Sequence, residues 1–358
     1  MHQNLVQFCF LTPGGFNNVA PQKKSSKNGT AGFSADLLKK FYYQMLLIRR
    51  FEEKASQLYG MGLIRGFCHL LIGQEAVVVG VQSAIKQNHD SVITAYRDHG
   101  HMLVCDMDPK GVMAELTGRI DGYSKGKGGS MHMFSREKKF YGGHGIVGAH
   151  VPLGTGLAFA HKYNKDGGIN TCYFGDGASN QGQVFEAYNM AALWGLPVLY
   201  IIENNGYGIG TSIERSGAGG PLYKRGEPFG IPGREVDGMD VMAVHEAALE
   251  AVDYVRKNNK PYILEAKTYR YRGHSMSDPG TYRPKEEVDD MKSNNDPINR
   301  LKDYMVKNKV ISDDDFKEVE KEIKAIVKEA AEFAQSSPEP DPSELWTDVL
   351  KDDNHQYA

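Results

Sequence analysis

The sequence predicts an α/β protein in which a central, mostly parallel sheet is flanked by helices, with helical segments toward the N- and C-terminal ends. Apolar, β-rich runs alternate with helical stretches in the middle of the chain, at 171–174, 184–194, 198–202 and 262–266. Most of the 40 glycines lie between Gly122 and Gly238, and none follows Gly280. The alternation is typical of a parallel sheet, and the glycine-free end of the chain is typical of helices.

The first 33 residues are predicted to form a flexible extension. They contain Lys23, Lys24 and Lys27 but neither arginine nor an acidic residue, and their apolar patch at 8–11 has no basic flank before it. This composition is poor for a secretory signal and unconvincing for a mitochondrial one. We therefore expect a bacterial cytoplasmic protein, with the mitochondrial matrix as the alternative.

Residues from 34 to about 118 are expected to be mainly helical, because apolar residues recur there at helical spacing. Leu38, Phe41, Met45 and Ile48 fall on one face of a helix, which predicts that this face is buried. Together with the alternating middle of the chain, this region is predicted to form one α/β domain, 34–283.

Residues 284–358 are predicted to form a C-terminal helical segment. Asp296-Pro297 reads as an N-cap followed by proline at the first helical position, and Ser312 with Asp315 reads as an acidic capping box. An apolar period follows in each helix, at 298, 301 and 305 and then at 316, 319, 323, 326 and 330. The proline-rich stretch 337–342 is expected to end the regular structure.

Composition excludes several classes of function. The 358 residues are 41% hydrophobic and 24% charged with a formal net charge of -3, so neither nucleic acid nor an anionic membrane is globally attracted. No apolar stretch reaches the ~20 residues of a membrane span. The four cysteines, Cys9, Cys68, Cys105 and Cys172, show neither disulfide-framework nor zinc-site spacing, which favours a reducing compartment.

The segment that carries chemistry is Gly175-Asp176-Gly177, which is followed 26 residues later by Asn204-Asn205. If 171–174 and 198–202 are neighbouring parallel strands joined by one helix, Asp176 and Asn205 meet at the carboxyl edge of the sheet, where α/β proteins bind ligands. A carboxylate and an amide oxygen suit Mg²⁺, which completes its coordination with phosphate and water. The sequence therefore predicts a site for a diphosphate and its magnesium ion.

These residues resemble the pattern of thiamin-diphosphate enzymes, and their surroundings resemble the α subunits of pyruvate dehydrogenase E1 components. The resemblance extends from about residue 46 to the C-terminus. It is carried by RGFCHL at 65–70, GQEA at 73–76, YRDHG at 96–100, ASNQGQ at 178–183, NMAALW at 189–194, YGIGTS at 207–212 and HSMSDPG at 274–280. It implies the thiamin-diphosphate-binding fold, with thiamin diphosphate and Mg²⁺ as cofactors.

The resemblance also implies roles for single residues. Asp176, Asn205 and the Tyr207 carbonyl would bind the metal ion. The diphosphate would be held by the backbone of Gly177 and Ala178 with Tyr96, Arg97 and Arg270, and the aminopyrimidine ring by Gly145, Ile146 and Val147. His69 and His274 would line the catalytic channel. His144 stands where the family usually has asparagine.

A partner is implied as well, because no glutamate of this chain is assigned to activate the cofactor's pyrimidine ring. The resemblance places that residue in an E1 β subunit, in an α2β2 heterotetramer. The implied reaction is oxidative decarboxylation of pyruvate and reductive acetylation of the lipoyl group of the E2 dihydrolipoyl acetyltransferase, toward acetyl-CoA. The α subunit of a branched-chain 2-oxoacid or acetoin dehydrogenase, and a non-catalytic homologue, are the alternatives; 274–280 favours pyruvate.

Three further patterns are interpreted as structural. Residues 143–148 match G-x-G-x-x-G, but no clear strand precedes them and Pro152 is expected to interrupt a following helix, which argues against dinucleotide binding. His99 and His101 lack metal-ligand partners in the sequence and are expected to be ordinary hydrogen-bonded histidines. The small residues 154, 156, 158 and 160 suit either internal packing or a subunit interface.

Overall fold

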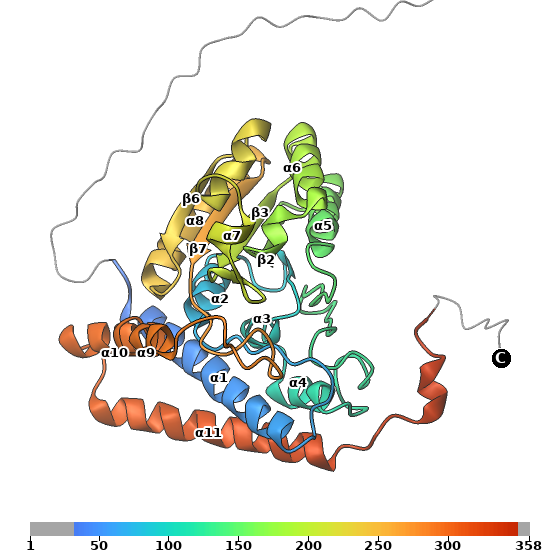
Figure 1. The fold of residues 1–358 in the computed structure, drawn as a ribbon, viewed down its shortest axis with the longest axis vertical. Helices are drawn as coiled ribbons and strands as arrows, with labels where there is room; N and C mark the ends of the chain where they lie inside the picture. The colour runs from blue at the N-terminus through green and yellow to red at the C-terminus, as the bar shows by residue number, and fades with distance from the viewer. Residues whose placement is uncertain (1–31, 350–358) are drawn as a thin grey trace, which may run out of the picture. The chain divides into compact units, whose positions relative to one another are not determined.

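The computed structural model describes residues 32–349, most of which belong to a compact unit that begins at Ser34 (Figure 1). Its centre is a parallel sheet in the order β1-β2-β3-β7-β6, which confirms the predicted fold class. The strands are β1 Ser91–Ile93, β2 Asn170–Gly175, β3 Val198–Asn204, β6 Gly233–Asp237 and β7 Tyr262–Lys267. The predicted extension 1–33, with Cys9, falls almost wholly outside the described residues.

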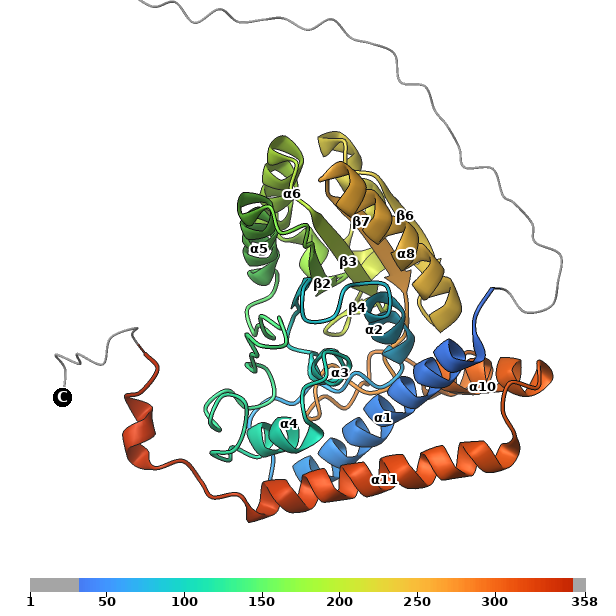
Figure 2. The same ribbon diagram turned by 180° about the vertical axis from the view of Figure 1, so that it is seen from behind.

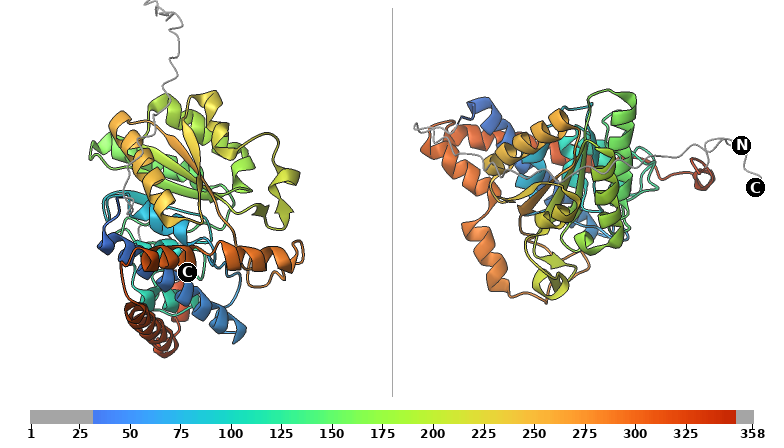
Figure 3. Two further views of the ribbon diagram at one scale, coloured as in Figure 1. Left: turned by 90° about the vertical axis from the view of Figure 1, so that its left-hand side faces the viewer. Right: turned by 90° about the horizontal axis from the view of Figure 1, so that it is seen from above.

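The two strand–helix–strand crossovers of the sheet run in opposite directions. α6 Gly182–Trp194 joins β2 to β3, and α8 Val241–Asn258 joins the edge strand β6 back to β7. Because such crossovers are right-handed, opposite directions place their helices on opposite faces of the sheet, as Figures 1 and 3 show. α5 His150–Asn164 packs beside α6, and α2 Glu75–Gln82 packs against α8. Reversal of direction between β3 and β7 creates a switch point at the sheet's carboxyl edge.

Two strands of the central sheet were not predicted. β1 has three residues in a region that was expected to be helical, and β6 is a polar edge strand in which only Val236 is buried. Neither has the continuous apolar run of β3, all seven residues of which are buried. Strands with so little local signal are defined by their pairing with a neighbour rather than by their own composition.

The N-terminal helices follow the sequence closely. In α1 Ala35–Gly60 the predicted face of Leu38, Phe41, Met45 and Ile48 is buried, and Ser34 caps the helix through its side chain. α3 His99–Val104 and α4 Pro109–Leu116 complete the region. A small hairpin and a helical turn follow β3, namely β4 Tyr207–Gly208, β5 Thr211–Ser212 and α7 Ile213–Ser216.

The C-terminal segment contains α9 Lys285–Asn294, α10 Pro297–Lys307 and α11 Asp313–Ser336, and both predicted N-terminal caps are present. α11 lies along α1 and α4 (Figures 1 and 2). Val319 and Ile326 are only partly buried, whereas Val327 and Ala334 are buried, so the apolar face of α11 is rotated slightly from the predicted one. The boundary at 283/284 stays a prediction.

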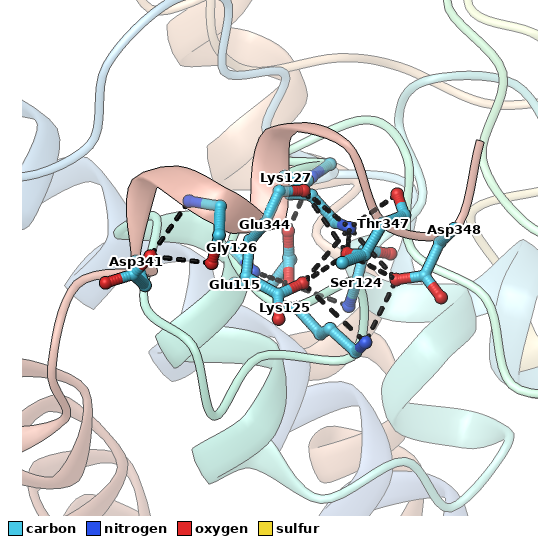
Figure 4. A network of polar contacts seen from close by, with 11 residues as sticks. Glu115, Ser124, Lys125, Gly126, Lys127, Asp341, Glu344, Thr347 and Asp348 are labelled. Carbon is cyan, nitrogen blue, oxygen red and sulfur yellow. Dashed lines mark hydrogen bonds and ion pairs between the residues drawn. The ribbon is translucent and has the colours of Figure 1, made fainter. Parts of the chain in front are cut away.

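One more short element follows α11, which corrects the expectation that regular structure ends at 337–342. A short 3-10 helix spans Pro342–Leu345. The Lys127 ammonium group donates to the Thr347 hydroxyl at 2.9 Å and pairs with Asp348 at 2.9 Å (Figure 4). Below it, the buried Glu115 carboxylate accepts four backbone N–H bonds, from residues 124, 126, 128 and 129.

Two smaller expectations concern α5 and the cysteines. α5 begins at His150, so Pro152 lies in its first turn, where proline is tolerated, and it does not interrupt the helix. A Cβ on Gly154 would lie 2.9 Å from Cys172 Sγ, so this glycine allows α5 to pack closely on the sheet, whereas Gly156 faces open space. Cys68, Cys105 and Cys172 are free and buried. No helix within 32–349 has the length and apolar content to cross a bilayer.

An arginine with a side chain only 13% exposed ties three helices together. The Arg49 guanidinium on α1 lies 2.5 Å from the Glu75 carboxylate at the start of α2 and 3.0 Å from Asp296, the N-cap of α10. We expect Arg49→Met to lower the free energy of unfolding by about 3–5 kcal/mol, because two buried carboxylates would lose their partner. Urea denaturation followed by circular dichroism measures the loss.

The matched control is Arg50→Met on the same helix, since Arg50 pairs with Glu53 and Glu320 at the surface. Its effect should stay within about 1 kcal/mol. Equal losses for the two variants would contradict the assignment of Arg49 as the tie between the helices.

Candidate active site

A cavity of about 320 Å³ opens at the carboxyl edge of the sheet, between the loops that follow β2 and β3. The structure brings most of the predicted site residues to its wall, although they come from segments far apart in the sequence. These residues are Tyr96, Arg97, Val147, Asp176, Gly177, Ala178, Asn205, Tyr207, Arg270 and His274. The predicted strand–helix–strand geometry that underlies Asp176 and Asn205 is therefore confirmed.

Three predicted residues do not line this cavity. His69 packs against two lining residues, with its ring centroid 4.4 Å from that of Tyr96 and 4.9 Å from that of His274. Gly145 and Ile146 lie in the loop before α5, and the Ile146 side chain is 74% exposed. Gly145, Ile146 and Val147 form an apolar rim beside the cavity mouth, and Val147 also lines the cavity.

Asp176 has the environment of a metal ligand. It follows β2 directly and is 2% exposed, and its Oδ2 has no hydrogen-bond partner among the described residues. Burial raises the pKa of this carboxyl to about 6, although the Arg270 charge opposes the shift. A buried carboxylate oxygen without a partner costs free energy until something positive binds it. This orphaned atom fits a divalent cation.

The loop after β3 supplies neutral oxygen atoms. Asn205 Oδ1 accepts a hydrogen bond from the Tyr207 backbone N–H at 3.3 Å, and the chain turns at Gly206, where φ is +82°. A Cβ on Gly177 would lie 3.1 Å from Gly208 Cα, so the loops after β2 and β3 touch through their backbones. One carboxylate, one amide oxygen and one carbonyl form a hard-oxygen donor set that suits Mg²⁺ with phosphate and water as further ligands.

Two buried arginines line the cavity together with the carboxylates of Asp176 and Glu203. Arg97 donates to the carbonyl oxygens of Leu70 at 2.6 Å and His274 at 2.8 Å, and Arg270 donates to that of Ile209 at 3.0 Å. Within residues 32–349 neither forms an ion pair with a carboxylate. Burial, together with the Arg270 charge, lowers the pKa of Arg97 to about 10. Guanidinium groups that form no close ion pair fit a diphosphate, which accepts bidentate hydrogen bonds.

The two predicted catalytic histidines are neutral and coupled to Arg97. His69 Nδ1 lies 2.8 Å from the carbonyl oxygen of His274, and since a carbonyl can only accept, Nδ1 carries the proton. Burial, reinforced by the Arg97 charge, lowers the pKa of His69 to about 3 and that of His274 to about 4. At neutral pH both therefore act as hydrogen-bonding groups rather than as cations.

Two cavity residues received no role from the sequence. Gln74 accepts a hydrogen bond from Asn205 Nδ2 at 2.9 Å, and Glu203 at the end of β3 is buried, with its pKa raised to about 7 by burial. Glu203 Oε1 lies 3.8 Å from His101 Nε2. The neighbouring His99 is a buried structural histidine whose Nδ1 contacts Glu52 at 2.8 Å, as expected. His101 has no hydrogen-bond partner in the described part of the chain, which corrects that expectation.

The chain matches a family of known proteins over most of its length. The dehydrogenase E1 component family model matches residues 43–343. The pyruvate dehydrogenase E1 component subunit alpha of Rhizobium meliloti is 62% identical over 92% of this chain and 95% of its own length. The corresponding Zymomonas mobilis subunit is 61% identical over 87% and 88%, and the mitochondrial one of Sminthopsis macroura is 52% identical over 88% and 85%. The chain therefore belongs to the dehydrogenase E1 component family of thiamin-diphosphate-dependent enzymes, beside the pyruvate dehydrogenase α subunits.

Proposed function

We propose that this chain is the α subunit of a pyruvate dehydrogenase E1 component, which acts together with a β subunit in an α2β2 heterotetramer. The observation that carries the proposal is the cavity itself, where the orphaned Asp176 Oδ2 faces a region with two unpaired buried arginines. High identity to relatives that bear this name supports pyruvate as the substrate and the lipoyl group of E2 as the acetyl acceptor.

Asp176, Asn205 and the Tyr207 carbonyl would hold Mg²⁺ at this site. The backbone N–H groups of Gly177 and Ala178 start the turn after β2 and would donate to the diphosphate. Arg97 and Arg270, with Tyr96, would neutralise its remaining charge. Thiamin diphosphate supplies the electron sink for decarboxylation when it is bound.

His69 and His274 would position the substrate. Both rings are neutral at pH 7, and the one N–H of His69 is already donated to the His274 carbonyl, so only His274 could donate to a carboxylate or carbonyl oxygen of the substrate. His69 would orient His274 and accept a hydrogen bond at Nε2, and the arginines would stabilise the charge. The His274 carbonyl accepts hydrogen bonds from both His69 and Arg97. These bonds would fix the histidines of the proposed substrate site relative to an arginine of the proposed diphosphate site.

The β subunit would complete the site across the exposed apolar rim formed by Gly145, Ile146 and Val147, which we propose to contact the aminopyrimidine ring. A second exposed apolar surface, on α5 and α6, suits the large subunit contacts of a heterotetramer. Its members are Leu153, Phe159, Tyr163, Leu193 and Trp194. Bacterial relatives at 62% and 61% identity favour the bacterial cytoplasm over the mitochondrial matrix.

The proposal is tested by co-expressing this chain with an E1 β subunit and titrating the purified complex with thiamin diphosphate, with and without Mg²⁺. We expect saturable binding that requires Mg²⁺, followed by turnover in a panel of 2-oxoacids and acetoin in which pyruvate is preferred. Preferred turnover of a branched-chain 2-oxoacid or of acetoin would replace the substrate assignment. Absence of Mg²⁺-dependent binding would instead indicate a non-catalytic homologue.

A further inference from the structure

We propose that Gln74 is a positioning residue for the metal site: it fixes the Asn205 amide so that its oxygen, and not its NH2 group, faces the cation beside Asp176. This inference rests on the proposed function. Gln74 comes from the loop before α2, 131 residues away in the sequence from Asn205, and both side chains line the cavity.

The hydrogen bonds settle the orientation of both amides without reference to a metal ion. The Tyr207 backbone N–H can only donate, so the Asn205 atom 3.3 Å from it is the oxygen Oδ1. The other Asn205 atom is then the NH2 nitrogen, which donates to its neighbour on Gln74 at 2.9 Å. Gln74 therefore presents its own oxygen to Asn205.

Loss of the Gln74 contact would leave the Asn205 amide poorly oriented. The remaining Tyr207 contact is long for an N–H···O bond, and the two ends of a terminal amide are nearly equal in shape. A flipped amide would point two N–H donors at the cation, which is repulsive, and would leave the Tyr207 N–H without an acceptor. Asn205 is only 8% exposed, so water offers little compensation.

The backbone that carries Gln74 is itself rigid. Gly73 has φ +104°, and a Cβ there would lie 2.3 Å from the Tyr269 carbonyl oxygen, so no other residue fits. The Gly73 N–H donates to Glu75 Oε2 at 3.0 Å, and the buried Glu75 is paired with Arg49. Support of this kind is what a group that orients a metal ligand requires.

The adjacent asparagine shows that each amide has its own acceptor. Asn204 Nδ2 donates to Glu265 Oε1 at 2.7 Å, and Asn204 Oδ1 accepts from the Gly206 N–H at 3.1 Å. Asn204 thus stabilises the turn that follows β3, while Asn205 and Gln74 line the cavity. The Gln74 contact is accordingly separate from the contacts that hold the turn itself.

The experiment uses the complex with the β subunit and measures the Mg²⁺ dissociation constant by calorimetry at a fixed, saturating concentration of thiamin diphosphate. Gln74→Met removes the acceptor and should weaken Mg²⁺ binding about 10- to 100-fold, the range for lost outer-shell contacts. Gln74→Glu keeps an acceptor oxygen and should restore affinity to within about threefold of the unmodified complex, or strengthen it. Gln82→Met, at the other end of α2, should bind like the unmodified complex, since the Gln82 amide contacts Gln87 instead.

A double-mutant cycle tests whether Gln74 acts by orienting the Asn205 amide or by supporting the metal site in general. Asn205→Asp replaces the amide by a carboxylate, whose two ends are both oxygen, so its flip no longer matters. In that background Gln74→Met should change Mg²⁺ affinity by less than about threefold. The same 10- to 100-fold loss in both backgrounds would overturn the proposal, as would Mg²⁺ binding by Gln74→Met equal to that of the unmodified complex.

Failure of the proposed function would look different. In that case the unmodified complex would not bind thiamin diphosphate with Mg²⁺, and all variants would share its behaviour. Should Gln74→Met not assemble, the comparison of Gln74→Glu with Gln74→Lys decides: the first keeps the acceptor and should bind Mg²⁺, and the second has only donors and should not. Equal binding by these two variants would also overturn the inference.

Discussion

Replacement of Asp176 by alanine is expected to abolish thiamin-diphosphate-dependent turnover of pyruvate in the complex of this chain with its β subunit. The Asp176 carboxylate is the one charged oxygen donor in the proposed metal site, and removing one partner from a buried charge pair costs about 3–5 kcal/mol. Each 1.36 kcal/mol is a factor of ten, so the loss should exceed about two orders of magnitude. Steady-state turnover and the Mg²⁺-dependent titration of thiamin diphosphate measure it.

A stability measurement shows whether that loss reflects the metal site alone. Because Asp176 Oδ2 is buried without a partner, its removal should not lower the melting temperature of the cofactor-free complex and is expected to raise it. Asp253→Ala is the control, since Asp253 is an exposed aspartate paired with Lys257 on α8, and it should leave turnover unchanged. Near-normal activity of Asp176→Ala would refute the metal assignment.

The isolated chain is expected to show no turnover of pyruvate, and activity should appear when the β subunit is added. The cavity supplies groups for the metal ion and the diphosphate, yet the side that would meet the aminopyrimidine ring ends in exposed apolar residues. Ile146 is 74% and Ile209 is 64% exposed in the chain by itself. That side of the proposed site is thus an exposed apolar surface, which another subunit would have to cover before water could be excluded.

Titration of a fixed amount of this chain with β subunit provides the measurement. Activity should rise to a plateau at a one-to-one ratio and stay at background in the absence of β. Decarboxylation of pyruvate by the isolated chain at a rate comparable to that of the complex would show that the site is complete within this polypeptide.

The parts of the fold that were predictable are those with a local signal. A few neighbouring residues are enough to predict some elements. Examples are the Ser312 cap of α11, the Asp296-Pro297 start of α10 and the continuous apolar run of β3. β1 and β6 escaped prediction because their conformation depends on pairing with β2 and β7. For the site, the sequence led to Asp176 and Asn205 because one strand–helix–strand unit connects them.

Contacts between residues far apart in the sequence were harder to predict. Gln74 lay within a segment that already carried the family resemblance, but nothing in its neighbourhood reveals that its amide meets Asn205. The sequence does not reveal that the His69 ring packs against those of Tyr96 and His274. Such contacts are decided by the packing of loops from separate elements, for which a single sequence has no periodic pattern.

The carboxylate of Glu115 affects how the loop 124–129 and its contact with Asp348 can evolve. It binds the loop 124–129 only through backbone N–H groups of residues 124, 126, 128 and 129, so these contacts use neither the Lys125 nor the Lys127 side chain. Lys125 and Lys127 are therefore free to serve a second purpose and clasp the tail through Asp348. Substitution at either lysine could alter the attachment of the tail while the loop keeps its course, and the two features can diverge independently among descendants.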